Sequence, residues 1–138
     1  MPVLIDTSVW SLLFRRDRQN LSARELEALE SLRELVRDKR ARVIGPIRQE
    51  LLSGIKNTRQ REQLQHRFRD FEDEPLTTAD YELAAEMSCK CRSTGIAVGS
   101  IDALICAAAS LRDFQIFTRD SDFERYGSIL HLHFHRPA

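Results

Sequence analysis

A short apolar run followed by an acid stands near the start of the sequence: Pro2-Val3-Leu4-Ile5-Asp6-Thr7-Ser8. Consecutive apolar residues bounded by turn-forming polar residues are typical of a strand that is buried on both faces. Such strands occur mainly in parallel sheets, because helices cover both faces of those sheets. The run therefore predicts an α/β fold, with Asp6 directly after its first strand.

Short strands and longer helices are predicted to alternate along the rest of the chain. Further strands are predicted at Ala41 to Gly45, around Val43-Ile44, at 115–118 and, as the last strand, at 128–134. Apolar residues at helical spacing predict helices over 8–14, 79–92 and 121–126, and others that begin at Ser22, Pro46 and Ser100. This alternation implies a parallel sheet with crossover helices. We expect one domain, residues 1–138, folded as a three-layer α/β/α sandwich around a mostly parallel sheet.

Composition narrows the class of protein. Lys plus Arg and Asp plus Glu both number 21, so the net charge is zero, which argues against a uniformly basic nucleic-acid binder. No apolar run approaches the ~18 residues of a membrane span, and no signal sequence is evident. Three cysteines are an odd number, which favours reduced thiols and a cytoplasmic protein without membrane association.

Four acids are predicted to meet at one edge of the sheet. Asp6 and Asp120 follow strands, Glu50 lies one turn into the helix after the second strand, and Asp102 lies in the first turn of an apolar helix. For each acid alone, a helix cap or an exposed helix face is an open explanation. Together they would repel one another unless a hard cation bound them, and oxygen ligands favour Mg²⁺ or Mn²⁺ over zinc.

The acids stand in four motifs that resemble those of the PIN-domain family, and within it the VapC-type toxins of bacterial toxin–antitoxin pairs. The motifs are Val3–Trp10, Ile47–Gly54, Ile101–Ala109 and Thr118–Phe123, in the family's order. Gly95 corresponds to the family's usual glycine before the third motif. The sequence departs from the pattern at Gln115 and in lacking Pro-Gly after Tyr126, and neither departure touches the acids.

The resemblance implies a metal-dependent endoribonuclease that acts on tRNA or other structured RNA. It also implies a cognate VapB-type antitoxin as inhibitor and a homodimer. By the same resemblance, one or two Mg²⁺ or Mn²⁺ ions would be held by the catalytic acids Asp6, Glu50, Asp102 and Asp120. Supporting roles fall to Ser8, Thr118 and Asp122, although Asp122 could instead cap the short helix that follows. A metal-activated water suits phosphodiester hydrolysis without a catalytic His or Lys.

Basic residues are the candidate contacts to RNA phosphates. The candidates are Arg15, Arg16, Arg18, Arg40, Arg59 and Arg61. Such clusters supply non-specific, salt-sensitive binding, and for each arginine a mixed-charge helix surface is the open alternative.

Two other functions, and one other metal site, are alternatives to the nuclease interpretation. A non-catalytic PIN-like module that binds RNA or a protein would have no reason to keep four mutually repelling acids. A phosphotransfer enzyme with Asp6 as nucleophile lacks a second acid beside it and a late lysine. His131, His133 and His135 would share one face of the predicted last strand, where a polar outer face is favoured over a transition-metal site.

Overall fold

A three-stranded parallel sheet forms the centre of the protein, whose computed structural model describes residues 1–15 and 18–137. The strands are β1 (Val3–Ile5), β2 (Ala41–Arg42) and β3 (Gln115–Phe117), in the order β2-β1-β3. Val3 pairs with Ala41 on one side and with Gln115 on the other. Because β1 is central and fully buried, the residue that follows it lies between the ends of its neighbours.

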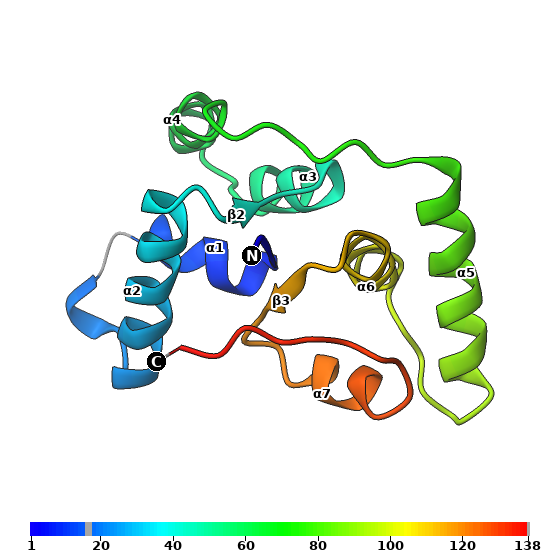
Figure 1. Ribbon diagram of the computed structural model, residues 1–138. Helices are drawn as coiled ribbons and strands as arrows, with labels where there is room; N and C mark the ends of the chain where they lie inside the picture. The colour runs from blue at the N-terminus through cyan, green and yellow to red at the C-terminus, as the bar shows by residue number, and fades with distance from the viewer. Residues whose placement is uncertain (16–17, 138) are drawn as a thin grey trace.

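Helices cover both faces of the sheet. Within the described residues they are α1 (Thr7–Leu13), the 3-10 helix η1 (Arg18–Asn20), α2 (Ala23–Arg37), α3 (Gly45–Ser53), α4 (Thr58–Phe68), α5 (Thr78–Arg92), α6 (Ser100–Arg112) and α7 (Asp122–Gly127). Figure 1 shows the strands between α2 on one side and α6, with α5 beyond it, on the other. The predicted α/β fold, a three-layer α/β/α sandwich with a parallel sheet, is confirmed.

Helix starts follow the capping residues in the sequence. Ser22 and Glu25 form the predicted capping box at the start of α2. Helix α5 begins one residue earlier than predicted, because Thr77 and Asp80 form a second capping box. Gly95 ends the turn after α5 with a φ of +84°, a conformation that favours glycine.

The predicted strand over 128–134 is wrong. The backbone N–H groups of Ser128, Ile129 and Leu130 donate to carbonyls of α7, which keeps this segment in the turn that ends the helix. The chain reaches β3 only at Phe134, which forms a single bridge with Ile116. The second strand also ends earlier than predicted: Val43 makes an isolated bridge to Asp73, outside β2, and Ile44 is the N-cap of α3.

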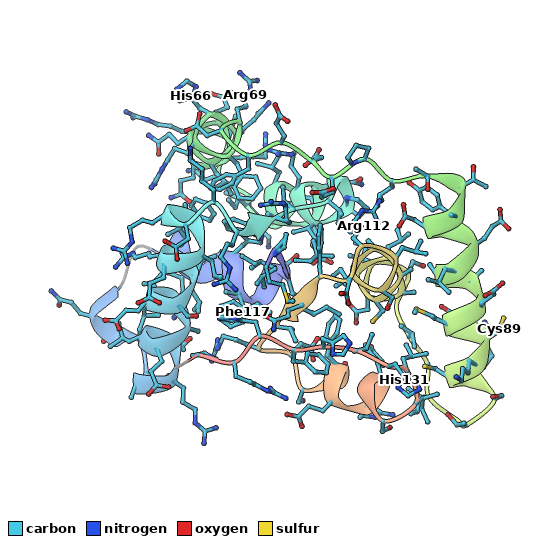
Figure 2. All side chains as sticks on the ribbon, in the orientation of Figure 1. His66, Arg69, Cys89, Arg112, Phe117 and His131 are labelled. Carbon is cyan, nitrogen blue, oxygen red and sulfur yellow. The ribbon has the colours of Figure 1, made fainter. Side chains whose placement is uncertain are left out.

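Aromatic residues fill the core on the side of α1. Trp10 is buried and meets Phe68 and Phe71 edge-on, with ring centroids 4.9 and 5.1 Å away. Phe117 lies near the middle of the fold (Figure 2) and is also buried. None of the described helices is both long and apolar enough to cross a membrane.

Candidate active site

Asp6 lies at the carboxyl end of β1, at the point where α1 begins. Its backbone N–H donates to the carbonyl of Phe117 at 2.9 Å, which ties this residue to the end of β3. The side chain of Asp6 is the N-cap of α1 and accepts a hydrogen bond from Ser8 N. A carboxylate is favoured here by the partial positive charge of a helix N-terminus, although the residue is only 5% exposed.

Two hydroxyl groups hold the Asp6 carboxylate in place. Ser8 Oγ donates to Asp6 Oδ2 at 2.7 Å, and Thr118 Oγ1 donates to the same oxygen at 2.9 Å. The two hydroxyls in turn accept hydrogen bonds from the backbone N–H groups of Arg119 and Asp120. Both hydroxyl groups therefore donate to Asp6 and fix the direction of its carboxylate. Every side-chain bond that the described residues give to Asp6 goes to Oδ2, so Oδ1 is available to another ligand.

Asp102 provides the electrostatic evidence that the four acids lie together. The pKa of its carboxyl group is raised to about 6, chiefly by burial, and the charges of Asp6, Asp120 and Glu50 contribute to the rise. The Tyr126 hydroxyl, which donates to Asp102 Oδ2 at 2.9 Å, opposes the shift. The acids of the other three motifs thus all act on Asp102 through their charges.

The two remaining acids of the set border the site from its exposed side. Glu50 is exposed on α3 and lines a cavity beside the acids. Asp120 is exposed on the loop after β3, and its Oδ1 accepts a hydrogen bond from Asp122 N. Asp122 is the first residue of α7, and its carboxylate lies 3.9 Å from Arg125 of the same helix.

The donor set fits a hard divalent cation. As they stand, no three His, Cys, Asp or Glu side chains in residues 1–15 and 18–137 are grouped tightly enough to hold a metal ion. The mutual repulsion seen in the pKa of Asp102 is what a cation would remove, and Oδ1 of Asp6 is available as a ligand. Burial raises the pKa of the Cys106 thiol to about 12, so this neighbouring sulfur remains protonated and is a poor ligand.

The three candidate histidines do not share one environment. His135 Nε2 lies 2.8 Å from Ser31 Oγ, and its ring packs against Phe117 at 4.8 Å between centroids. Burial lowers the pKa of His135. His131 and His133 are exposed on the irregular segment that replaces the predicted strand. The proposed common face of the three residues is absent from the described structure.

The candidate RNA-binding arginines are scattered. Arg15 pairs with Glu25 at 2.8 Å, and Arg61 donates to the carbonyl of Ile55. Arg40 precedes β2 and donates to the Met1 carbonyl, which puts it at the amino edge of the sheet, opposite the acids. Arg59 is exposed on α4.

Two of the candidate RNA-binding arginines are not among the described side chains. Arg16 lies outside the described residues, and so does the side chain of Arg18. The structure therefore places Asp6, Glu50 and Asp120 where their charges act on Asp102, without a tight metal cluster among the described residues, and it does not gather these arginines around the acids.

Two site residues were missed at the sequence level. Tyr126 contacts Asp102 from α7, 24 positions along the chain, and Arg119 lies beside Asp120 and pairs with Glu25 at 3.6 Å. Neither stood out in the sequence, because an isolated Tyr in a short helix and an Arg in a loop are common. The one sign in the sequence that Arg119 belongs to the site was its position inside the fourth motif, next to Asp120.

Comparison with solved structures supports the same fold. FitAcB from Neisseria gonorrhoeae is 18% identical, with 98% of this chain and 97% of that chain covered and a TM-score of 0.76. VapBC2 from Rickettsia felis, bound to a DNA fragment from their promoter, is 14% identical, covers 98% of each chain and has a TM-score of 0.70. A toxin–antitoxin complex from Klebsiella pneumoniae is 20% identical over 88% of this chain and 89% of that chain, with a TM-score of 0.64.

Sequence comparison gives the family. No curated protein sequence matches the chain at a significant level. The model of the PIN domain matches residues 3–129, a range that includes Asp6, Glu50, Asp102 and Asp120. Because this match spans nearly the whole chain and every member of the acidic set, the chain belongs to the PIN domain family.

Proposed function

We propose that this protein is a VapC-type toxin, a metal-dependent endoribonuclease that hydrolyses phosphodiester bonds in tRNA or other structured RNA. The observation that supports the proposal most is that Asp102, near the carboxyl edge of the sheet, is acted on by the charges of Asp6, Asp120 and Glu50. Membership of the PIN domain family supports it, since PIN domains are generally nucleases. The non-catalytic binding module is the alternative.

In this proposal Asp6, Glu50, Asp102 and Asp120 hold one or two Mg²⁺ or Mn²⁺ ions. Such an ion, when bound, makes a water nucleophilic near neutral pH and stabilises the charge that develops on the phosphate. Ser8 and Thr118 fix the direction of the Asp6 carboxylate through their hydroxyl bonds. These positioning bonds limit the reorganisation that ligand binding requires.

A cavity beside Asp120 offers arginines to a polyanionic substrate. It has a volume of about 420 Å³ next to the loop after β3, and its lining is of mixed charge, with Arg24, Arg119 and Arg136 beside Glu27, Asp120 and Glu124. Arginine guanidinium groups bind phosphates with good geometry. The scattered arginines, Arg15, Arg16, Arg18, Arg40, Arg59 and Arg61, remain predicted RNA contacts.

The partners of the structural neighbours suggest how the protein is controlled. The Klebsiella pneumoniae structure is described as a toxin–antitoxin complex. By analogy we propose that a VapB-type antitoxin binds and inhibits this protein, that it forms a homodimer, and that it acts in the cytoplasm. The antitoxin proposal rests on likeness of fold, and the neighbouring reading frame is the place to look for the partner.

RNA cleavage by the purified protein tests the proposed activity. Wild type, Asp6→Asn, Asp102→Asn and the control Asp38→Asn would be given tRNA with Mg²⁺ or Mn²⁺, and again with chelator. We expect cleavage by wild type and by the control, whose carboxylate is exposed at the end of α2, away from the site. Loss of an acid should lower the rate at least about 100-fold. Metal-independent cleavage, or full activity of both site variants, would rule the proposal out.

A further inference from the structure

A cavity of about 390 Å³ opens beside the acids, between α1, α3 and α4. Its walls come from one face of each helix: Thr7 and Phe14 of α1, Glu50 of α3, and Gln63 and Arg67 of α4. Because Glu50 belongs both to the acidic set and to the cavity wall, the two spaces adjoin. A phosphodiester held at the acids would therefore have a neighbouring nucleotide next to this cavity.

The lining combines flat apolar surface with polar groups. Phe14 is half-buried, and the Arg67 guanidinium lies 5.7 Å from the centroid of its ring. Gln63 is exposed on α4 and supplies an amide, which both donates and accepts hydrogen bonds. Thr7 Oγ1 is buried without a hydrogen-bond partner among the described residues. The cavity thus offers an aromatic face, hydrogen-bonding groups and a positive charge.

These features match a nucleobase better than a protein side chain. A base has apolar faces that stack on aromatic rings or guanidinium planes, and polar edges that pair with amides and hydroxyls. Its attached phosphate complements the charge of Arg67. An apolar side chain from a protein partner would take the Gln63 amide out of water without giving it a hydrogen-bond partner, at a cost in free energy. The volume also falls in the range of about 300–1,000 Å³ that is usual for small-ligand pockets.

We propose that this cavity binds one unpaired base of the RNA, next to the bond that is cut, and so gives the enzyme a base preference at that position. The inference rests on the proposed nuclease function. It assigns substrate recognition to Phe14, Gln63 and Arg67, which lie outside the acidic set.

Mapping the cut sites tests the inference. A pool of RNA with randomised single-stranded regions would be digested by wild type, Gln63→Ala and Phe14→Leu, and the new ends would be sequenced. Gln65→Ala is the matched control, since Gln65 is an exposed glutamine on the same helix outside the lining of the cavity. We expect wild type and the control to share a base preference at one position beside the cut. Gln63→Ala should weaken it about tenfold, the scale of one base-edge contact, and Phe14→Leu should weaken it similarly.

The outcomes separate this inference from the proposed function. Absence of cleavage by every protein would overturn both. Cleavage with the same base preference in wild type and Gln63→Ala would overturn the base pocket alone. An unchanged cleavage pattern together with weaker binding of the antitoxin by Gln63→Ala would also overturn it, in favour of a protein occupant. Because Gln63 is exposed, its replacement should leave the melting temperature unchanged, and this can be checked first.

Discussion

Asp6, which is buried, and Asp102, which is half-buried, are held by different partners. Asp6 receives two hydroxyl bonds and lies at the positive end of α1, as its N-cap. Asp102 receives one hydroxyl bond, from Tyr126, and otherwise faces burial and like charges. The structure thus stabilises one carboxylate and leaves its neighbour under electrostatic strain. A bound cation would relieve that strain, which makes the orientation of Asp102 important for metal affinity.

Replacement of Tyr126 by Phe should weaken metal binding. The change removes the hydroxyl that orients Asp102 and opposes the rise of its pKa, while the buried ring remains. We expect the Kd for Mn²⁺, measured by calorimetry at pH 7.5, to increase about 10-fold or more. Tyr81→Phe is the control, because Tyr81 is 54% exposed. Equal Kd values for wild type and Tyr126→Phe would show that the Tyr126 contact has no role in the site.

The four acids could be found from the sequence because each stands at a recognisable place, after a strand or near the start of a helix. Asp6 comes directly after an apolar strand, and Asp120 lies in the loop that follows Phe117 at the end of another, so a parallel sheet brings them to one edge. Tyr126 could not be found this way, since its contact with Asp102 depends on how α7 packs back towards α6. The hydrogen bonds of Ser8 and Thr118 follow from the ends of β1 and β3 lying side by side.

Helices α5 and α6 are joined by a buried ion pair. Arg112 of α6 donates to both carboxylate oxygens of Asp80 on α5, at 2.6 and 2.9 Å, and also to the carbonyls of Ala108 and Pro75. Arg112 is labelled beside α6 in Figure 2. The Asp80 side chain is 1% exposed, and its backbone partner Thr77 is the N-cap of α5. This one cluster therefore links the cap of α5 to the last turn of α6.

Acid should weaken the protein through Asp80. The Arg112 hydrogen bonds hold its pKa at about 2, below the value near 3.9 of an unfolded chain. The resulting stability is present above pH 4 and is lost as the pH falls towards 2. We expect the free energy of unfolding, from urea titrations, to lose about 2 kcal/mol across this window because of this group.

The Asp80→Asn variant isolates that contribution. Its free energy of unfolding should be lower than that of wild type at pH 7, because Arg112 loses its charged partner, and it should vary less between pH 4 and pH 2. Arg112→Ala should cost about 3 kcal/mol at pH 7, since it leaves a buried charge unpaired. Identical pH profiles for wild type and Asp80→Asn would contradict this account.

Secondary structure was predictable where local signals and packing agreed. The apolar run of β1 and the capping box of Ser22 each lie within a few residues, and both elements are confirmed. The segment 128–134 has an apolar and polar pattern suited to a strand, but the end of α7 uses its first backbone N–H groups. Whether these N–H groups pair with α7 or with a neighbouring strand depends on how the chain packs in three dimensions, which the sequence pattern does not show.

The charge balance of the whole molecule is consistent with a nuclease that carries its own acidic site. The 21 acidic and 21 basic residues give no net charge, and the two cavities beside the acids carry both signs: Arg67 with Glu50 in one, and Arg24, Arg119 and Arg136 with Glu27, Asp120 and Glu124 in the other. Such a distribution attracts a polyanion only if the acids are neutralised. We therefore expect a divalent cation to bind among Asp6, Glu50, Asp102 and Asp120.

Titration with Mn²⁺ tests this claim most directly. Calorimetry at pH 7.5 would compare wild type with Asp102→Asn and with the surface control Asp38→Asn. We predict one or two bound ions in wild type and in the control, and at least about tenfold weaker binding in Asp102→Asn. Absence of binding by wild type, or equal affinity in Asp102→Asn, would contradict the account.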